Sequence, residues 1–500
     1  MKSRKQTAAH FEAPRTRTRP AEQLPPGPPV QAITVIPATR TPISERLRIA
    51  IVGGGPGGLF TAWLLEQLAA GRVEITILEA TQRLGGKLLS PMFSKAPIRY
   101  EAGAAEFYDY SPIGPDPLRE IVEGFGLATV PLGGGTVQVE DRPLANADDV
   151  RDAFGPAAHA DLLAFDAWAR SAMTPREFYD SGTDHAASAA PCGRFDRALA
   201  CTTGSRAVRR YLEAMIHSDL ATPPATTSVA YGLQNYLMND PAYMRLYGIA
   251  GGNEQLVGAL AARIDAAVRL ATRVEEVAAD AAGRLRLVLR EAGVRRAETF
   301  DIAVLALPMD ALLRMAFPDD RLGAAMQRHL RQHDHPAHYV RVTLLLDRPL
   351  ERQPGDDAYL MLDAFGGCCL YLESAREPAG DRGVLGWLIA GSGAETMASW
   401  ADESLLDAVL ETLPEPLRWC REHVLEPRVH RWVSAVSGLP GGWQPLPVDR
   451  RHRPAPDSHP GLFVVGDYLY DSTLNGVLDS ADHVAGWVAA LACEGRKGVG

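Results

Sequence analysis

The sequence predicts an α/β fold with a second, α+β domain, and three patterns along the chain support this prediction. A strand, a glycine turn, a helix and a second strand follow one another between residues 47 and 78. Helical spacing of apolar residues dominates 145–245, and segments typical of antiparallel strands follow between 339 and 391. At about 150 residues per domain, a chain of 500 residues is long enough for two or three domains.

The composition narrows the class of protein. Hydrophobic residues make up 46% of the chain and charged residues 22%, which is typical of a soluble globular protein. The formal net charge of -10 argues against nucleic acid as a partner, because binding to a polyanion needs a basic surface. No apolar run reaches about 18 residues, so we expect no membrane span, no membrane partner and a cytoplasmic location.

Cysteine and histidine spacing gives no metal site. The six cysteines lack CxxC spacing, so we expect reduced thiols without a disulfide framework or a zinc site; they occupy positions 192, 201, 368, 369, 420 and 493. Four histidines cluster in "HLRQHDHPAHY", at positions 329, 333, 335 and 338. An HxH pair can bind a metal, but no carboxylate or cysteine pattern completes a site, so we expect a polar loop entering a strand.

Residues 1–45 are predicted to be a disordered tail. They are rich in Arg, Pro and Thr and show neither a helical nor a strand period. A signal peptide would need an apolar segment after its basic start, and none is present. An Arg-rich transit segment is the alternative, and Glu12 and Glu22 count against it.

The first predicted domain begins with "RLRIAIVGGGPGGLFTAWLLEQLAAGRVEITILEA". This segment has the pattern of a β-α-β unit, with strands at 47–52 and 73–78, a glycine turn at 53–58 and a helix at 59–70. The turn fits G-x-G-x-x-G, and an acidic residue, Glu79, follows the second strand. This context predicts a Rossmann-like unit that binds a dinucleotide, with its pyrophosphate at the helix N-terminus and Glu79 at a ribose.

Each glycine of the turn has a separate physical task. Gly53 permits the tight turn, Gly55 lets the pyrophosphate approach the backbone, and Gly58 lets the helix pack closely on the strand. NAD and FAD both use such a unit, so the glycines alone do not distinguish them.

The segment "EATQRLGGKLLS" resembles the R-x-G-G-[RK] segment of the FAD-dependent amine oxidase superfamily, which includes flavin amine oxidases and L-amino-acid oxidases. The resemblance favours FAD over NAD and extends over 46–490. Four more segments resemble that superfamily in the same order: "YEAGAAEFYD", "GIAGGNEQLVGALAARIDAAVRLATRVEEVAAD", "FDIAVLALPMDAL" and "GLFVVGDYLYDSTLNGVLDSA".

The resemblance implies a domain division. A discontinuous, glutathione-reductase-like FAD-binding domain would comprise 46–110, 246–310 and 455–492. The substrate-binding domain would comprise 111–245, mainly helical, and 311–454, with an antiparallel sheet.

The resemblance also implies which residues bind FAD. Val274 would contact the adenine through its backbone, and Asp467 would lie at the ribityl and pyrophosphate groups. A helix beginning near Val477 would direct the N–H groups of Val477 and Leu478 at the negative charge of the reduced flavin. The cofactor-binding residues are then Gly53, Gly55, Pro56, Gly57, Gly58, Glu79, Ala80, Arg83, Gly86, Lys87, Gly103, Ala104, Ala105, Glu106, Val274, Gly466, Asp467, Gly476, Val477 and Leu478.

Three positions carry information on the substrate. Glu106 matches the position where L-amino-acid oxidases hold a carboxylate-binding Arg, so it suits a cationic substrate, as in polyamine oxidases; the alternative is that it pairs with a neighbouring Arg. Val477 matches an aromatic cage position and gives an aliphatic wall, while Asp479-Ser480 resembles L-amino-acid oxidases. Arg341 matches a Lys that holds a water near the flavin; it would orient water or a carboxylate, or be a surface or ion-pair residue.

Two further observations bear on the cofactor. "RWVSAVSGLPGGWQ" has no cysteine where monoamine oxidases attach FAD covalently, so we expect non-covalent FAD. A second G-x-G-x-x-G for NADPH is absent, since Thr396 stands at the third glycine position of "AGSGAET". The electrons are therefore expected to come from the substrate.

The sequence thus predicts an FAD-dependent oxidase for an amine or an amino-acid-like substrate, with Glu106 and Arg341 as its candidate catalytic residues. Hydride transfer to the flavin would give an imine, then a carbonyl and ammonia, and oxygen as acceptor would give hydrogen peroxide. The alternative is a flavin-dependent desaturase or dehydrogenase acting on a C–C bond of a hydrophobic substrate. A third reading is a non-catalytic partner protein with a flavin fold. A homodimer is compatible with each.

Overall fold

The computed structural model describes residues 46–181, 193–351, 357–373, 380–441, 446–470 and 472–494. The predicted tail, 1–45, and Cys192 lie outside these residues. Within the described chain, none of the helices combines the length and the apolar character that crossing a membrane requires.

A five-stranded parallel sheet contains the glycine turn. Its strand order is β18-β12-β1-β2-β8, so β1 lies in the middle between β12 and β2. The strands are β1 (Leu47–Val52), β2 (Val73–Leu78), β8 (Ala267–Arg269), β12 (Ile302–Leu305) and β18 (Leu462–Val464). The two strands of the predicted β-α-β unit have the predicted bounds, and its helix, α1 (Pro56–Leu68), begins three residues earlier than predicted.

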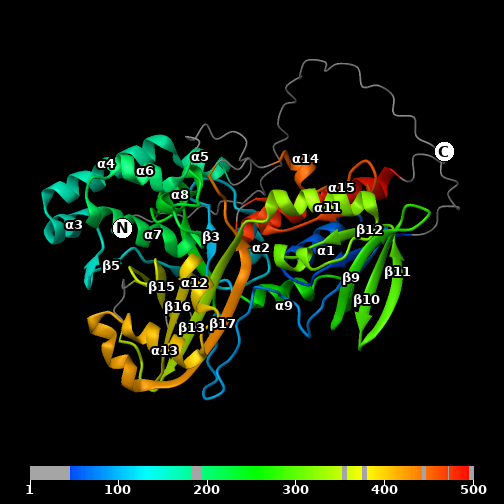
Figure 1. Ribbon diagram of the computed structural model, residues 1–500. Helices are drawn as coiled ribbons and strands as arrows, with labels where there is room; N and C mark the ends of the chain where they lie inside the picture. The colour runs from blue at the N-terminus through cyan, green and yellow to red at the C-terminus, as the bar shows by residue number, and fades with distance from the viewer. Residues whose placement is uncertain are drawn as a thin grey trace, which may run out of the picture. The chain divides into compact units, whose positions relative to one another are not determined.

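The two faces of this sheet are covered differently. Ile49 and Ile51 pack with α1 and α15 in one buried cluster, whereas Ala50 and Val52 face the opposite way, as alternation along a strand requires. On the first face lie α1, α2 (Pro117–Gly124), α9 (Gln255–Ala261) and α15 (Leu474–Glu494). On the other lie a three-stranded sheet of β9 (Thr272–Ala279), β10 (Leu285–Glu291) and β11 (Val294–Phe300), with α10 (Met309–Leu313) and α11 (Asp320–His333). Figure 1 shows these elements as one group.

A seven-stranded mixed sheet forms the second part of the molecule, in the order β17-β13-β16-β15-β14-β5-β6. Its strands are β5 (Val137–Val139), β6 (Arg142–Leu144), β13 (Pro336–Leu346), β14 (Tyr359–Leu362), β15 (Cys368–Leu372), β16 (Gly383–Ala390) and β17 (Val424–Ser437). Pairing from β17 through to β14 is antiparallel, which confirms the antiparallel sheet predicted for 339–391.

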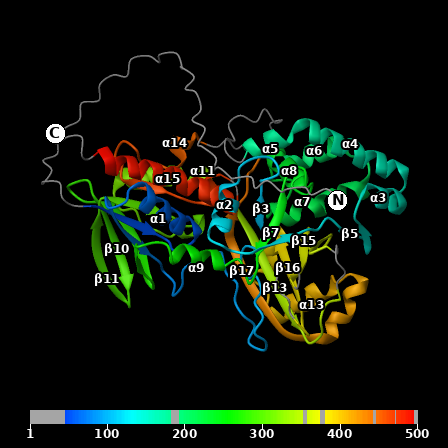
Figure 2. The same cartoon turned by 180° about the vertical axis from the view of Figure 1, so that it is seen from behind.

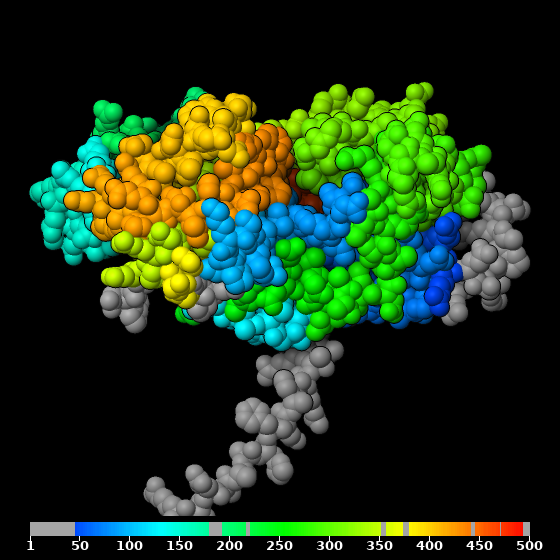
Figure 3. Space-filling model, turned by 90° about the horizontal axis from the view of Figure 1, so that it is seen from below, coloured from blue at the N-terminus to red at the C-terminus, as the bar shows by residue number. Residues whose placement is uncertain are grey.

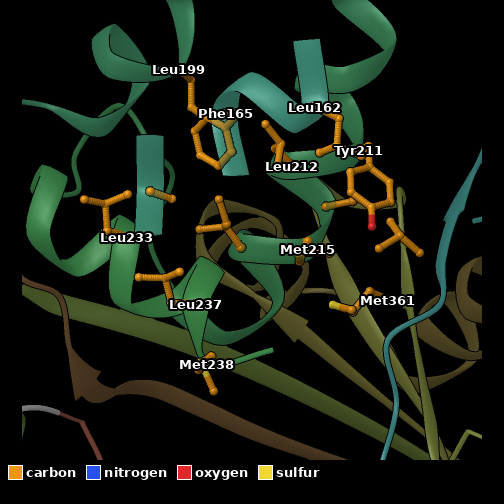
Figure 4. Packing of buried hydrophobic residues seen from close by; sticks show 14 of the residues in the cluster. Leu162, Phe165, Leu199, Tyr211, Leu212, Met215, Leu233, Leu237, Met238 and Met361 are labelled. Carbon is orange, nitrogen blue, oxygen red and sulfur yellow. The ribbon is translucent and has the colours of Figure 1, made fainter. Parts of the chain in front are cut away.

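The seven-stranded sheet also buries both faces. Val340 and Val342 pack on one side against α12 (Gly391–Met397), α13 (Asp402–Glu411) and the 3₁₀ helix η2 (Glu415–His423). The opposite side faces the helices α3 (Ala147–Phe154), α4 (Pro156–Ala172), α5 (Pro175–Ser181), α6 (Phe195–Thr202), α7 (Arg206–Leu220) and α8 (Val229–Leu237). Figure 2 shows this helical group from behind, beside β15 and β16. Figure 4 shows its core, where Phe165 and Leu212 pack with Met361 of the sheet.

Local sequence explains where many of these helices begin. Side chains at the N-cap accept backbone N–H groups at α2 (Asp116), α3 (Asn146), α7 (Ser205), α8 (Ser228) and α11 (Asp319). Proline occupies the first turn of α1, α2 and α4, where its missing N–H costs nothing.

A small sheet and a side-chain contact lie between the five-stranded and the seven-stranded sheets. A small sheet of β3 (Phe107–Asp109), β7 (Arg245–Ile249) and β4 (Thr129–Leu132) follows the glycine segment at 103–106. The segment near residue 95 reaches β17, where Glu426 accepts the backbone N–H groups of Ser94 (2.9 Å) and Lys95 (2.8 Å). In Figure 3 this segment, in blue, adjoins the orange surface of β17.

Candidate active site

The glycine turn after β1 leaves no room for side chains at two positions. Gly53 has φ +108°, and a Cβ there would lie 2.3 Å from the carbonyl oxygen of Ala306. A Cβ on Gly58 would lie 2.0 Å from the carbonyl oxygen of Gly53. The backbone therefore turns tightly at the carboxyl ends of β1 and β12, and α1 packs directly on it.

The predicted R-x-G-G-K turn lies against this glycine turn. The N–H of Gly85 donates to the carbonyl of Gly54 (2.8 Å), and a Cβ on Gly86 would lie 3.2 Å from the Cα of Gly55. At Gly55 an added Cβ would find Gly86 Cα no nearer than 3.8 Å, so open space remains over the N-terminus of α1. Two glycines facing one another beside free helical N–H groups fit a dinucleotide pyrophosphate.

Arg83 supports the turn. Its guanidinium donates to the carbonyls of Leu84 (3.0 Å), Leu88 (3.3 Å) and Gly86 (2.5 Å). These bonds hold the backbone of the turn in its curve. Pro56 and Gly57 belong to the first turn of α1.

Glu79 ends β2 beside the glycine turn. One carboxylate oxygen accepts the N–H of Gly54 (2.8 Å), and the other accepts the N–H of Thr81 (2.7 Å). Each oxygen keeps a second lone pair, so both remain able to accept ribose hydroxyls. β9 begins here, because Thr272 donates its N–H to the Glu79 carbonyl (2.8 Å), and Val274 lies two residues further along. Ala80 continues the turn directly after Glu79.

The segment 100–106 lies against Lys87. A Cβ on Gly103 would lie 1.9 Å from the Lys87 carbonyl oxygen, which requires glycine there. The side-chain amide of Asn253 donates to the carbonyls of Ala104 (2.9 Å) and Ala105 (3.1 Å), and Asn253 is fully buried. Sequence reasoning missed Asn253, although it directly follows the Gly-Gly pair of a segment that carried the resemblance.

Lys87 joins the glycine segments to the C-terminal turn. Its ammonium lies 3.0 Å from the Asp467 carboxylate and also donates to the carbonyl of Ala435 on β17. Val465 separates Gly466 and Asp467 from β18, which ends at Val464. Residues far apart along the chain thus meet at the carboxyl ends of the parallel strands.

The start of α15 differs from the prediction. The helix begins at Leu474, because Thr473 caps it: its hydroxyl accepts the N–H of Gly476 (3.0 Å) and its carbonyl accepts the N–H of Val477 (3.2 Å). The Val477 N–H therefore already donates to the Thr473 carbonyl, and its assignment as a flavin donor stays a prediction. Leu478 lies one residue deeper and is 4% exposed. Free N–H groups belong to the first helical positions instead.

The side chain of Val477 lies beside α1. A Cβ on Gly57 would lie 3.5 Å from Val477 Cγ1, and Val477 packs with the buried cluster between α1 and α15. This places Val477 with the glycine turn, on a different part of the structure from Arg341.

Arg341 is a fully buried ion-pair residue. It lies on β13 with 0% exposure, and its guanidinium pairs with Glu373, which is 5% exposed. A Cβ on Gly386 would lie 3.2 Å from Glu373 Oε1, so glycine makes room for the pair. Of the three alternatives for Arg341, the ion pair is present and the surface position is excluded. Nε and Nη1 of Arg341 have no protein hydrogen-bond partner in the described chain.

Glu106 is linked to this pair through Tyr371. The Tyr371 hydroxyl donates to Glu106 Oε2 (2.8 Å), and the Arg341 guanidinium lies over the Tyr371 ring, 5.0 Å from its centre. Glu373 already neutralises Arg341, so Glu106 sits beside an ion pair without net charge. Tyr371 and Glu373 were missed from the sequence, because neither has a local motif.

A histidine pairs across the sheet with Arg341. His430 of β17 is its antiparallel neighbour, and its ring nitrogen lies 3.1 Å from the Tyr100 hydroxyl. Burial, and then the charges of Arg341 and Arg428, lower the pKa of His430. Burial also raises the pKa of Tyr100 to about 12. A neutral tyrosine therefore shares a hydrogen bond with a neutral imidazole here.

A small aromatic cavity lies beyond Glu106. It has a volume of about 30 Å³, room for one or two water molecules. Tyr108 lies on β3, and Glu106 and Tyr110 stand one residue before and one residue after that strand. The cavity is lined by Tyr108, Tyr110, Phe178, Tyr231, Gln234, Asn235, Met238 and Thr473. Met238, at the end of α8, is visible at the edge of the helical core in Figure 4.

The histidine cluster also differs from its prediction. His329 and His333 do not belong to a polar loop; they lie on α11, 5% and 1% exposed, with ring centres 4.7 Å apart. Both pack against Tyr468, whose hydroxyl is 3.5 Å from His329 Nε2. His338 lies on β13 and accepts the N–H of Ser434 (3.1 Å). The described residues contain no group of three or more metal-binding side chains.

Comparisons with known proteins give the family and the fold of this chain. The model of the family "Flavin containing amine oxidoreductase" matches residues 56–489. Cyclohexylamine oxidase from Brevibacterium oxydans has a similar structure (TM-score 0.67, 18% identity, covering 89% of this chain and 99% of that one). So does putrescine oxidase with bound putrescine (TM-score 0.65, 17% identity, 89% and 99%). A protein from Exiguobacterium sp., whose proposed activity is protoporphyrinogen oxidase, follows (TM-score 0.64, 18%, 89% and 99%).

No curated protein matches the sequence. The structural likenesses, at 16–18% identity, support a mixed α/β fold like that of FAD amine oxidases. The family match covers most of the chain and confirms both the predicted superfamily and FAD as the cofactor. The chain therefore belongs to the flavin-containing amine oxidoreductase family and is an FAD-dependent oxidase or dehydrogenase that acts on a small molecule.

Proposed function

We propose that this enzyme oxidises a cationic amine. The observation that carries the proposal is Glu106, a carboxylate held by Tyr371 beside the neutral Arg341–Glu373 pair. A carboxylate next to a neutralised arginine attracts an ammonium group and repels a substrate carboxylate. This favours an amine with a second cationic group over an amino-acid-like substrate.

FAD would bind non-covalently along the glycine segments. A Rossmann-like, glutathione-reductase-like domain of 46–110, 246–310 and 455–492 would hold it, with 111–245 and 311–454 forming the substrate-binding domain. The pyrophosphate would meet the turn at Gly55 and Gly86, a ribose would meet Glu79, and the ribityl chain would meet Asp467. The close approach of these segments and the open space over Gly55 support this placement.

When bound, FAD would accept a hydride from the carbon next to the substrate nitrogen. The chain's own residues would orient the amine: Glu106 would bind its ammonium group, and Tyr371 would fix the carboxylate in one rotamer. Tyr108 and Tyr110 would exclude water from the carbon chain. The imine product would hydrolyse to a carbonyl and ammonia, and oxygen as electron acceptor would yield hydrogen peroxide.

In the test, the purified yellow enzyme is mixed without oxygen with each member of a panel of amines and amino acids. Reduction of the flavin is measured as the loss of its absorbance. Diamines and polyamines should bleach the flavin faster than monoamines, and monoamines faster than amino acids. Bleaching by amino acids alone would contradict the role of Glu106. Failure of every amine and amino acid would contradict amine oxidation altogether.

A desaturase or dehydrogenase acting on a C–C bond is the second candidate. Gly466-Asp467 favours it, because related desaturases often carry Gly-Asp where amine oxidases carry Gly-Glu. The product mass separates the two reactions. A product that retains nitrogen and has lost two hydrogens would support desaturation, whereas a carbonyl with released ammonia would support amine oxidation.

A further inference from the structure

A buried hydrogen-bond relay reaches the turn between β18 and α15 from outside the sheet. His452 follows the short helix α14 (Val448–Arg451) and is 0% exposed. Its Nδ1 lies 3.1 Å from the Val448 carbonyl, and its Nε2 lies 3.1 Å from the Ser480 hydroxyl. The N–H of Gly466 donates to the same hydroxyl oxygen, at 3.1 Å.

The chemistry of these groups fixes the direction of the relay. A carbonyl only accepts, so His452 Nδ1 carries the proton and donates to Val448. Burial lowers the pKa of His452 to about 3, so the ring is neutral and its Nε2 accepts. Ser480 must then donate to His452 while accepting from Gly466. Ser480 thus donates one hydrogen bond and accepts another, and its hydroxyl binds the Gly466 N–H.

Arg451 holds the next part of the same turn. It is 1% exposed, and its Nη1 donates to the Leu469 carbonyl (2.9 Å) while Nε donates to the Leu446 carbonyl (2.9 Å). Its guanidinium also lies over the Tyr470 ring, 5.0 Å from the centre. Burying a guanidinium is costly, so such an arginine is retained where its hydrogen bonds define a geometry.

The turn held in this way carries the groups proposed to face FAD. Asp467 lies one residue after Gly466 and is bound on its other side by Lys87 (3.0 Å). Leu469 ends the 3₁₀ helix η3 (Asp467–Leu469), and Thr473, the cap of α15, follows four residues later. Lys87 therefore binds this turn at Asp467, whereas Arg451 binds it at Leu469 and His452 binds it through Ser480 at Gly466.

We propose that Arg451 and His452 are positioning residues for FAD, which set the place of Asp467 and of the α15 N-terminus without contacting the cofactor. The inference rests on the proposed placement of FAD against Gly466 and Asp467. Displacing a binding group by about 1 Å is enough to weaken a preorganised site, so losing either anchor should weaken FAD binding.

The experiment compares R451M, H452L and R450M in the full-length holoenzyme. Arg450 is the exposed neighbour on the same helix, so R450M is the matched control. FAD affinity is measured from the fluorescence of flavin released on serial dilution, and stability from the unfolding midpoint at saturating FAD. R451M and H452L should raise the FAD Kd at least tenfold, while R450M should leave it unchanged.

Two further variants separate positioning from folding. R451K keeps a donor for the Leu469 carbonyl and should restore part of the affinity. S480A interrupts the relay, so S480A and H452L should each raise Kd and their combination should raise it little further. If R451M fails to fold, R451K and S480A still decide the question.

The outcomes are distinct. Unchanged FAD Kd in R451M, H452L and S480A, with only a lower unfolding midpoint, would overturn the inference and leave a structural role. D467A tests the placement of FAD: if D467A leaves the Kd unchanged, that placement fails, and the inference fails with it. If D467A weakens FAD binding and R451M and H452L do not, the placement of FAD stands and the positioning role of Arg451 and His452 is refuted.

Discussion

In the five-stranded sheet the site is made by the backbone, at turns where glycine is required, whereas in the seven-stranded sheet it is made by side chains. A Cβ on Gly58 would overlap the Gly53 carbonyl, and a Cβ on Gly103 would overlap the Lys87 carbonyl. At the seven-stranded sheet, Arg341 pairs with Glu373 and lies over the Tyr371 ring, and Tyr371 in turn binds Glu106, which precedes β3. A backbone site tolerates few replacements, whereas a side-chain site can change its ligand by single substitutions.

The largest effect is expected where the backbone makes the site. Gly58→Ala places a Cβ 2.0 Å from a carbonyl oxygen, and the turn has no flexible atom that can yield. We expect loss of FAD and a fall of about 3 kcal/mol or more in the free energy of unfolding. Urea unfolding and flavin content measure both. Gly258→Ala in α9, where an added Cβ meets nothing within 4 Å, is the control and should keep FAD.

Next in size is the buried ion pair of the seven-stranded sheet. Glu373→Leu leaves the Arg341 guanidinium buried without its partner, which should cost about 3–5 kcal/mol in urea unfolding. Adding Arg341→Met should recover most of this loss, because a buried pair replaced by apolar residues is often neutral. If Glu373→Leu alone is as stable as the double variant, the Arg341–Glu373 pair does not contribute to the stability of this sheet.

Glu106→Gln tests the proposed substrate site. It removes the negative charge and keeps an oxygen for the Tyr371 hydroxyl, so stability should change little. The kcat/KM for a cationic amine should fall by about 10- to 100-fold, the size expected for a charge-assisted hydrogen bond. Asp109→Asn, at the end of β3 and three residues after Glu106, should have no such effect. Equal losses for Asp109→Asn would mean that the strand, and not the carboxylate, matters.

The smallest expected effect is a change of stability with pH, caused by His333 on α11, which covers one face of the five-stranded sheet. Burial lowers the pKa of His333 to about 3, from an ordinary value near 6.5, so below pH 6.5 the unfolded chain binds a proton that the folded chain does not. Stability should therefore fall as pH decreases, by about 1 kcal/mol between pH 7 and 5.5. His333→Phe should flatten this slope, whereas the partly exposed His159→Phe should not. An unchanged slope in His333→Phe would contradict the buried neutral ring.

The same contrast explains what the sequence revealed. The strands at 47–52 and 73–78 were predicted to the residue, because apolar runs bounded by glycines and Glu79 are local signals. The start of α15 was predicted three residues too late. Thr473, which precedes Asn475-Gly476 in the sequence, was not recognised as the cap of this helix. The Thr473 hydroxyl caps the helix, and this contact, not the glycine, determines where α15 begins.

The side-chain network could not be read from the sequence. Tyr371 and Glu106 are 265 residues apart, and no spacing rule connects them. Arg341 was correctly considered as an ion-pair residue, but its partner Glu373 lies on another part of the chain. The helical assignment of His329 and His333 was missed because a run of histidines and charges resembles a loop, whereas the buried face of α11 depends on Tyr468 across the fold.

The order of strands in the parallel sheet has a consequence for biosynthesis. Arg48, on the central strand, bonds to Asp301, which is 253 residues away, and β18 joins the sheet only at Leu462–Val464. The sheet therefore cannot close before residues 462–464 have been synthesised, and contacts this distant in sequence form slowly. Cofactor loading should follow the pairing of β18, and the nascent chain should need protection of its unpaired β12 edge until then.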